Sequence, residues 1–354
     1  MSGYPVDAAI AQGNGYTIVE NASLLGRNTF RVPARAALLV DVHDEAALEE
    51  VFAFAALRSR PLLVLGEGSN LLLAGDWPGV VLSMATRGIE ILDDDSNQAT
   101  VRVAAGENWN DLVHWSLAHG FAGLENLVLI PGTVGAAPIQ NIGAYGVEIG
   151  ESIHGVHAWD RVEHRRTFIT HDECAFAYRD SLFKRDADRY LVVAVDFRLG
   201  RTPQLRLDYA GIAAELATLG GGEPTPPRVA EAVARLRTRK LPNPALIGNA
   251  GSFFKNPIVA ADVAQALRAT RPDLPAWPTD DGAVKLSAAW LIEASGFKGW
   301  REGDAGISAL HALVLVNHGN ASGADLLRAA RTVASGVRQR FGVALQAEPR
   351  IVGA

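Results

Sequence analysis

Three side chains in this sequence have the chemistry of catalysis, but none stands beside an obvious partner. They are Ser252 in NAGSFFKNP (249–257), Arg179 in AYRDSLFK (177–184) and Glu348 in ALQAEPRIVG (344–353). A serine nucleophile needs a base and a G-x-S-x-G elbow, and Ser252 has neither. An arginine fork can grip a carboxylate, and a glutamate can act as an acid or an electrostatic group. A local Arg–Asp pair and a surface glutamate remain the alternatives for the last two.

Two glycine-rich stretches could hold a ligand. GEGSNLL (66–72) follows an apolar strand pattern, and LIPGTVGAAPIQNIGAYGVEIG (129–150) is almost free of charge. Glycine lets backbone N–H groups approach an anion closely, so both stretches could cradle a phosphate or a flat polar ligand. A tight turn and a buried irregular connection are the structural alternatives. Neither stretch matches the Rossmann or P-loop pattern.

The surrounding pattern alternates strand, helix and strand from Ala36 onward, which implies an α/β layer, and a second α+β region follows the helix over 229–240. Strands are predicted at 37–42, 61–65, 79–84, 88–92, 99–106 and 190–199, and helices at 45–57, 107–120, 229–240 and 323–341. Ser322 and Asp325 form a capping-box pattern at the start of the last helix. TLGGGEPTPPR (218–228), with its glycines and prolines, is the best linker candidate.

Composition limits the class of function. The chain has 354 residues, enough for two or three domains, with 48% hydrophobic and 20% charged residues. Its formal net charge of −6 argues against nucleic-acid or anionic-membrane partners. A single cysteine, Cys174, excludes an internal disulfide framework and fits a reducing compartment. With no signal peptide or membrane-length apolar run apparent, we expect a cytoplasmic protein.

The order of the motifs is more specific than any one of them. GEGSN, IPGTVGAAPIQNIGAYG, YRDSLFK, GNAGSFFKNP and AEPRIVG follow one another along the chain. Together they closely resemble the UDP-N-acetylenolpyruvoylglucosamine reductase family, also called UDP-N-acetylmuramate dehydrogenase or MurB. The resemblance runs from about Asn28 to the C-terminus, and chain length and LDY (207–209) place it with the longer-loop type I subtype.

The resemblance implies an α+β fold with two parts. An FAD-binding module of the vanillyl-alcohol-oxidase/PCMH type, with two α+β subdomains, would span 28–215, divided into about 28–84 and 85–215. A separate α+β substrate-binding domain would span 228–343, with 344–354 returning to the FAD module. Residues 1–27 are predicted to form a loose leader.

The resemblance also implies a reaction. NADPH would reduce a non-covalent FAD, and the flavin would deliver hydride to C3 of the enolpyruvyl ether of UDP-N-acetylglucosamine. By match to the family, Arg179 stabilises the enolate-like intermediate, Glu348 assists it and Ser252 protonates C2. A general acid of this kind needs no histidine base, which resolves the isolation of Ser252. The expected partners are the UDP-sugar and NADPH, and the chain is expected to be a monomer.

Further contacts carry over from the family residue by residue. The FAD contacts are Gly66, Glu67, Gly68, Ser69, Asn70, Pro131, Gly132, Thr133, Gly135, Ala136, Gln140, Asn141, Gly143, Ala144, Tyr145 and Gly146. The substrate contacts are Tyr178, Tyr209, Lys240, Gly251, Lys255 and Asn256. Tyr209 matches a tyrosine on a mobile loop that closes over the substrate. The chain departs from the family at Arg31, where glycine is expected, and at Ala136 and Ala137, where serines often occur.

Two other functions stay open. Another FAD-dependent oxidoreductase of this scaffold would act on an alcohol or aldehyde and commonly attaches FAD through histidine or cysteine, which the flavin motifs here lack. A non-catalytic nucleotide-sugar binder would not need Arg179, Ser252 and Glu348 together. HGVHAWDRVEHRRTFITHDEC (154–174) contains four histidines and Cys174, but its spacings match no zinc pattern, and no metal is expected.

Overall fold

The computed structural model describes residues 11–220 and 222–353. Their contacts divide the chain into two compact units. Unit 1 takes the described residues of Met1–Ala22, Ala36–Glu67 and Pro78–Arg237, and unit 2 those of Ser23–Arg35, Gly68–Trp77 and Thr238–Ala354. The chain therefore enters unit 2 three times, which a simple division into successive domains does not anticipate.

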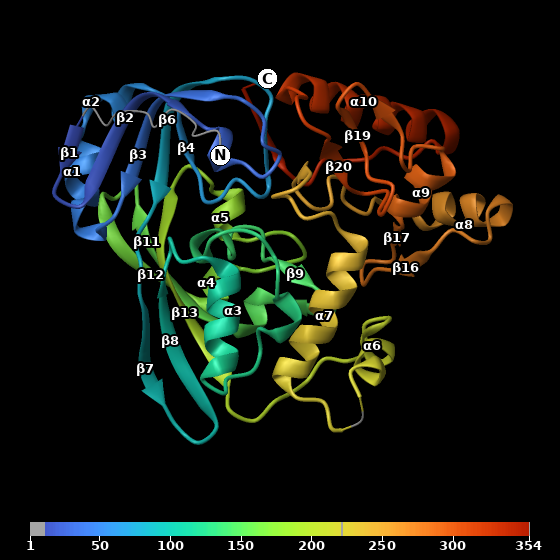
Figure 1. Cartoon of the computed structure of the whole chain (residues 1–354), viewed down its shortest axis with the longest axis horizontal. Helices are drawn as coiled ribbons and strands as arrows, with labels where there is room; N and C mark the ends of the chain where they lie inside the picture. Colours follow the sequence, from blue (N-terminus) through green and yellow to red (C-terminus); the bar gives the residue numbers. More distant parts are fainter. Residues whose placement is uncertain (1–10, 221, 354) are drawn as a thin grey trace. The chain divides into compact units, whose positions relative to one another are not determined.

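The first sheet of unit 1 has the strand order β1-β2-β3-β6-β4 (Figure 1). Its strands are β1 (Ala11–Gly13), β2 (Tyr16–Ser23), β3 (Arg35–Val42), β4 (Leu62–Val64) and β6 (Trp77–Met84). β1 and β2 form an antiparallel hairpin, whereas β4 runs parallel to β6. The sequence predicts a loose leader over 1–27, yet residues 11–23 supply two strands, and Tyr16 is buried and donates to Glu50 at 2.7 Å. Residues 1–10 of that leader lie outside the described residues.

The second sheet of unit 1 is antiparallel, in the order β12-β11-β13-β8-β7. Its strands are β7 (Ile89–Asp94), β8 (Gln98–Ala104), β11 (Ile153–Asp160), β12 (Arg165–Thr170) and β13 (Tyr190–Gly200). β13 lies at the centre and is buried along most of its length. The predicted strands at 99–106 and 190–199 are confirmed by β8 and β13.

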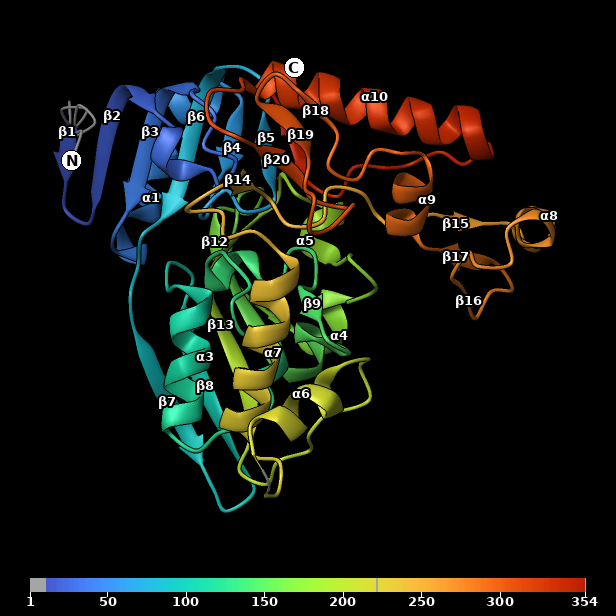
Figure 2. The same cartoon turned by 45° about the vertical axis from the view of Figure 1, so that its right-hand side comes forward.

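Helices pack on this second sheet. The helices of unit 1 are α1 (Leu48–Ala53), α2 (Ala55–Ser59), α3 (Trp109–Ala118), α4 (His171–Cys174), α5 (Leu182–Arg185), α6 (Ile212–Thr218) and α7 (Pro226–Lys240, whose last residues belong to unit 2). Figures 1 and 2 both show α3 and α7 lying along the sheet. Leu112 of α3 and Val233 of α7 join the same buried cluster as Val195 of β13. Asn108 caps α3, since its side chain accepts from the N–H groups of the first turn.

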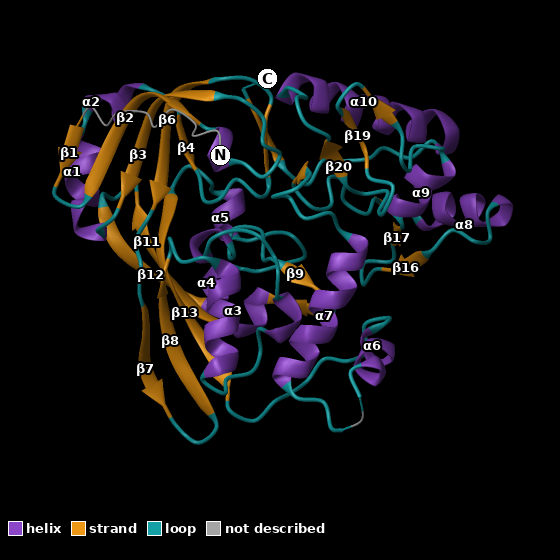
Figure 3. Cartoon of the chain, in the orientation of Figure 1, coloured by secondary structure: helices purple, strands orange, loops and turns teal. Residues whose placement is uncertain are grey.

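The described residues of unit 2 form short strands and helices (Figure 3). Its sheets are β14-β20-β19-β18, β15-β17-β16 and β21-β5. Their strands are β5 (Leu71–Leu73), β14 (Gly248–Asn249), β15 (Ile258–Val259), β16 (Ala276–Pro278), β17 (Val284–Leu286), β18 (Arg301–Glu302), β19 (Ala305–Ile307), β20 (Leu315–Asn317) and β21 (Arg350–Val352). The helices are α8 (Ala261–Thr270), α9 (Ala288–Ala294) and α10 (Gly323–Phe341). The Ser322–Asp325 capping box that begins α10 is confirmed.

Two local predictions differ from the structure. The helix predicted over 45–57 is interrupted, because Phe54 adopts an extended conformation between α1 and α2, and its ring contacts Tyr16 at 5.5 Å between centroids. The division between the units falls within α7, after Arg237, rather than in the glycine- and proline-rich segment 218–228. The apolar face of α7 packs in the core of unit 1, and that burial outweighs the linker-like composition before it.

Candidate active site

Arg179 lies in a tight turn before α5. The backbone N–H groups of Ala177 and Asp180 each donate to the other's carbonyl at 3.0 Å. Arg179 itself has a φ of 54°, in the left-handed region that costs a non-glycine residue about 1–2 kcal/mol. The fully buried Ser181 fastens the turn, because its Oγ donates to the Ile139 carbonyl at 2.6 Å.

The guanidinium of Arg179 lies against the glycine-rich segment 131–146. Its Nη2 donates to the Gly143 carbonyl at 2.6 Å and its Nη1 to the Asn141 carbonyl at 3.5 Å. The guanidinium carbon is 5.3 Å from the ring centroid of Tyr178, a side chain that is largely exposed. Unit 1 therefore brings together two motifs that are separated in the sequence.

Glu67 joins the two glycine-rich stretches within unit 1. Its Oε2 accepts from the Gly132 N–H at 3.0 Å, and its Oε1 accepts from Asn108 Nδ2 at 2.7 Å. The stretches pack so closely that a Cβ on Gly66 would lie 2.7 Å from Thr133 Oγ1. Only glycine fits there without movement, so the close approach is built into the sequence.

The GEGSN turn continues into unit 2. There the Gly68 carbonyl accepts from Thr29 N at 3.3 Å, and the Asn70 carbonyl accepts from Arg350 N at 3.1 Å. Gly68 has a φ of 65°, a conformation that favours glycine. Ser69 lies between these anchored residues. The turn is thus held by its backbone on either side.

A small hairpin forms the end of the second glycine-rich stretch. β9 (Gly143–Ala144) pairs with β10 (Val147–Glu148), and Tyr145 and Gly146 form its tip with φ values of 51° and 83°. The ring of Tyr145 meets that of Tyr209 edge-on at 5.0 Å between centroids. Burial raises the pKa of Tyr145, an effect that the positive charge of Arg237 opposes. Two expected contact residues, for cofactor and for substrate, therefore touch in unit 1.

In unit 2, Ser252 and Glu348 lie on paired segments. The Glu348 N–H donates to the Phe253 carbonyl at 2.8 Å, and Phe254 forms a bridge with Ala347. Both Ser252 and Glu348 are partly buried. Residues from two distant motifs are therefore held side by side by main-chain hydrogen bonds, which are insensitive to side-chain rotation.

The other expected substrate contacts of unit 2 lie partly on these paired segments. Gly251, with a φ of 66°, donates to Asn249 Oδ1 at 3.0 Å, and the Lys255 N–H donates to the Gln346 carbonyl at 3.0 Å. The Oδ1 of Asn256 accepts from Ala288 N at 3.0 Å, so that part of Asn256 secures the start of α9. Lys240 is exposed at the end of α7.

Comparisons with known proteins identify the family. Residues 243–352 match the UDP-N-acetylenolpyruvoylglucosamine reductase C-terminal domain, and residues 36–164 match an FAD binding domain. UDP-N-acetylenolpyruvoylglucosamine reductase of Xanthomonas campestris pv. campestris (strain B100) is 54% identical over 340 residues, 96% of this chain and 97% of that protein. The chain belongs to the UDP-N-acetylenolpyruvoylglucosamine reductase family. It is therefore an oxidoreductase, with a reductase function in peptidoglycan precursor synthesis.

A second curated relative supports the family, and a solved structure supports the fold. The reductase of Xanthomonas oryzae pv. oryzae (strain PXO99A) is 53% identical over 343 residues, 96% of this chain and 97% of that protein. The crystal structure of the Thermus caldophilus reductase matches with a TM-score of 0.64 at 24% identity, over 95% of this chain and 98% of that one. The expected α+β fold, with an FAD-binding domain and a separate reductase C-terminal domain, is confirmed.

FAD is the cofactor of the reductase family's N-terminal domain, and the residues present fit it. A glutamate beside a diphosphate would repel it, but both carboxylate oxygens of Glu67 already accept hydrogen bonds from the protein. Apart from Glu67, residues 66–70 and 131–136 carry no charged side chain, and their backbone amides and the side chains of Ser69, Asn70 and Thr133 suit an anion. The backbone approach at Gly66 and Gly135 leaves no room for a Cβ on either residue.

The histidine-rich stretch of the reductase has structural partners. His157 contacts Asp196 at 3.0 Å, His171 Nδ1 lies 3.1 Å from the Ile153 carbonyl, and the Cys174 thiol contacts the Ile169 carbonyl. Burial raises the pKa of the Cys174 thiol to about 12. Within residues 11–220 and 222–353, no cluster of three or more His, Cys, Asp or Glu side chains could hold a metal ion. None of the described helices has the length and apolar character needed to cross a bilayer.

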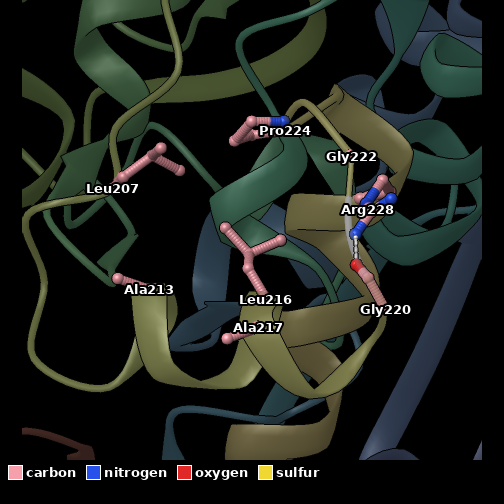
Figure 4. Close-up of a pocket in the computed structure, with 8 residues that line it drawn as sticks. All are labelled: Leu207, Ala213, Leu216, Ala217, Gly220, Gly222, Pro224 and Arg228. Carbon is pink, nitrogen blue, oxygen red and sulfur yellow. Dashed lines mark hydrogen bonds between the residues drawn. The ribbon is translucent and has the colours of Figure 1, made fainter.

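An apolar cavity of about 280 Å³ lies outside the expected site residues (Figure 4). It is formed between α6, the start of α7 and the loop that joins them. Figure 4 shows Leu207 and Leu216 facing it and Arg228 donating to the Gly220 carbonyl. Leu207, in LDY (207–209), is the one lining residue that belongs to a motif used for the family assignment.

The sequence interpretation missed Glu148 and Ser181. Glu148 Oε2 accepts from Asn141 Nδ2 at 2.7 Å, and Ser181 supports the Arg179 turn. Glu148 had a signal, because it and Glu125 are the only charged residues in the stretch 121–150. Ser181 lies in the AYRDSLFK motif, but its supporting role could not be predicted, since its bond to Ile139 joins positions that are distant in the sequence.

Proposed function

We propose that this reductase converts UDP-N-acetyl-3-O-(1-carboxyvinyl)-glucosamine to UDP-N-acetylmuramate in the cytoplasm, with NADPH as the reductant. The observation that supports this most is the pairing of the segments that carry Ser252 and Glu348 through the bond from Glu348 N to the Phe253 carbonyl. An acid and a carboxylate kept adjacent in this way suit a proton transfer to carbon.

Each catalytic side chain has a role that its chemistry permits. FAD, when bound, supplies the hydride for C3. Ser252 Oγ–H donates the proton to C2, a step that asks the serine to be an acid and not a nucleophile. The planar fork of Arg179 meets the charge that develops on the substrate carboxylate and C2, which a lysine would meet less well. Glu348 assists at the same centre.

The proposed binding residues fall into two groups, those that hold FAD and those that hold the UDP-sugar. We propose that 66–70 and 131–146 hold the FAD, within a module that spans 28–215, and that the substrate-binding domain spans 228–343. The UDP-sugar is bound by Tyr178, Tyr209, Lys240, Gly251, Lys255 and Asn256. The two lysines supply positive charge for the diphosphate in a chain whose formal net charge is −6.

Spectroscopy of the purified protein tests this function. We expect a yellow flavin spectrum, bleaching of that spectrum by NADPH, and its return on anaerobic addition of the enolpyruvyl substrate. NADH serves as the comparison for coenzyme preference. A protein that takes up no FAD would contradict the proposal. So would a protein whose oxidised flavin is bleached by an alcohol or aldehyde and whose reduced flavin does not react with the enolpyruvyl ether.

A further inference from the structure

The side chain of Asn141, near Arg179, makes three hydrogen bonds to protein groups. It is 98% buried, with a relative exposure of 2%. Its Nδ2 donates to Glu148 Oε2 at 2.7 Å and to the Ala177 carbonyl at 3.2 Å, while its Oδ1 accepts from Gly150 N at 2.8 Å. Both donor hydrogens of Nδ2 and one lone pair of Oδ1 are therefore committed to protein groups, so the Asn141 side chain could donate to FAD only by breaking one of these bonds.

These bonds hold both ends of Arg179 to one segment. The Asn141 side chain fastens the main chain of the Arg179 turn at Ala177. The backbone carbonyls of Asn141 and Gly143 accept the guanidinium at 3.5 and 2.6 Å. The main chain of the Arg179 turn is thus hydrogen-bonded to Asn141, and the Arg179 guanidinium to Asn141 and Gly143 of the same glycine-rich stretch.

The turn needs such support. Arg179 and Asn141 both have φ in the left-handed region, at 54° and 47°. A backbone in that region persists only where its surroundings hold it, and such residues gather at functional sites. The bond from Asn141 to Ala177 enters the turn at the residue that pairs with Asp180, so it acts on the geometry of the turn directly.

Glu148 fixes the orientation of the Asn141 amide. A carboxylate can only accept, so it requires the nitrogen of Asn141 on its side, and the Gly150 N–H requires the oxygen on the other. Glu148 is itself held, because it takes part in a capping box with Glu151 and pairs with Gly143 in the β9–β10 hairpin. The chain of contacts runs from Glu148 through Asn141 to the Arg179 turn.

We propose that Asn141, oriented by Glu148, is a positioning residue that sets the geometry of Arg179 toward the substrate carboxylate. The proposal rests on the proposed function, in which Arg179 meets that carboxylate. A fork of donors works within a narrow geometry, and a displacement of about 1 Å can cost on the order of a hundredfold in rate. Asn141 would then affect the reaction with the enolpyruvyl substrate more strongly than the reaction with NADPH.

A double-mutant cycle on the FAD-loaded enzyme tests this. Asn141→Ala, Arg179→Ala and the double variant are compared by stopped-flow absorbance of the flavin, with separate measurements of its reduction by NADPH and its reoxidation by the enolpyruvyl substrate. We expect Asn141→Ala, at saturating FAD, to slow reoxidation by about 10- to 100-fold and to slow reduction by NADPH much less, although Asn141 lies in the segment proposed to hold the FAD. We expect the double variant to be no slower than Arg179→Ala, because both changes remove the same interaction.

Glu148 provides a second route if Asn141→Ala does not fold. Glu148→Gln keeps an oxygen that can accept from Asn141, so its reoxidation rate should stay within about threefold of the unmodified enzyme. Glu148→Ala removes that oxygen and should behave like Asn141→Ala. Equal effects of the glutamine and alanine variants would overturn the positioning role.

Asn126 is the matched control. It is also a buried asparagine whose Nδ2 donates to two carbonyls, those of Tyr145 and Arg206, both at 2.9 Å, but it touches neither Ala177 nor the Arg179 guanidinium in any bond described above. The effect of Asn126→Ala should multiply with that of Arg179→Ala. The proposal would be overturned if the effects of Asn141→Ala and Arg179→Ala on the reoxidation rate also multiplied. It would be overturned as well if Asn141→Ala weakened flavin reduction and FAD affinity as much as it slowed reoxidation. Either result would leave the proposed function intact. An unmodified enzyme that does not reoxidise with the substrate would overturn both.

Discussion

The Glu348 N–H donates to the Phe253 carbonyl at 2.8 Å, which places the glutamate one residue across from Ser252. Phe253 and Phe254 are both buried, and Phe253 packs against Phe30 at 6.2 Å between ring centroids. The pairing therefore rests on the core of unit 2. The segments that carry Ser252 and Glu348 are therefore anchored in buried, packed structure, as the positioning of groups for a proton transfer to carbon requires.

Replacing Ser252 should separate the two half-reactions. Ser252→Ala removes the proposed proton donor, so reoxidation of the flavin by the enolpyruvyl substrate should fall by about 10²- to 10⁴-fold. Reduction by NADPH should be unchanged, because it needs no proton at C2. Stopped-flow absorbance of the flavin measures both rates. If Ser252→Ala also lost the reduction of its flavin by NADPH, the role of Ser252 as the acid would be contradicted. Ser322→Ala, at the cap of α10, is the control for the loss of a hydroxyl elsewhere in unit 2.

Glu67 should control the affinity for FAD. Glu67→Gln keeps the size of the side chain but offers one acceptor oxygen where Gly132 N and Asn108 Nδ2 both donate. Losing one such bond costs about 1–2 kcal/mol, so the dissociation constant of FAD should rise by about tenfold. Quenching of flavin fluorescence on titration of the apoprotein measures this. Glu173→Gln, in the exposed capping box of α4, is the control and should leave FAD affinity unchanged.

Asp196 should make stability depend on acid pH. Burial tends to raise the pKa of its carboxyl, but hydrogen bonds from Arg102 and His157 outweigh burial and hold that pKa at about 2. Because the folded pKa lies below the unfolded value of about 3.9, the stabilisation is present above pH ~4 and is lost as the pH falls toward about 2. The pKa difference corresponds to about 2 kcal/mol at neutral pH.

Asp196→Asn tests this stabilisation. The variant should lose at least that free energy of unfolding at pH 7, and its deficit relative to the unmodified chain should shrink toward pH 2. Urea unfolding at a series of pH values measures the change. Glu231→Gln, which removes an exposed pair with Arg235, should change stability by less than about 1 kcal/mol. A deficit of Asp196→Asn that does not vary with pH would contradict the linkage.

Arg31 explains the departure from the family at NTFRVP. Its φ of 56° lies in the region where glycine is favoured, which accounts for the glycine expected there. Both Arg31→Gly and Arg31→Ala lose the hydrogen bond from the Arg31 side chain to the Ala245 carbonyl. The difference between their free energies of unfolding therefore measures the cost of the positive φ. Arg31→Gly should be the more stable by about 1 kcal/mol.

Thermal and urea unfolding of the two Arg31 variants measure this difference. Arg35 supplies the control, because it begins β3 and has no positive φ. There the order should reverse, with alanine more stable than glycine by about 0.5–1 kcal/mol. The same order at both positions would mean that φ at Arg31 does not govern stability.

The sequence by itself determined the family, the cofactor and the long regular elements. Five motifs in fixed order identify the reductase, because each needs residue types that its backbone geometry or chemistry demands. The helix over 323–341 was predicted with its bounds, since the capping box, the apolar stripe and the following glycine are all local. Strand patterns such as 190–199 are equally local.

The tertiary structure decided what holds the site residues in place. Ser181 lies in the YRDSLFK motif and Glu148 just beyond IPGTVGAAPIQNIGAYG, but their importance lies in bonds to Ile139 and Asn141 that no local pattern encodes. The same holds for residues 11–23, whose polar, glycine-dotted sequence suggests a loose leader but forms strands through sheet pairing. Pairing between distant segments depends on the whole chain's packing, and short-range patterning cannot specify it.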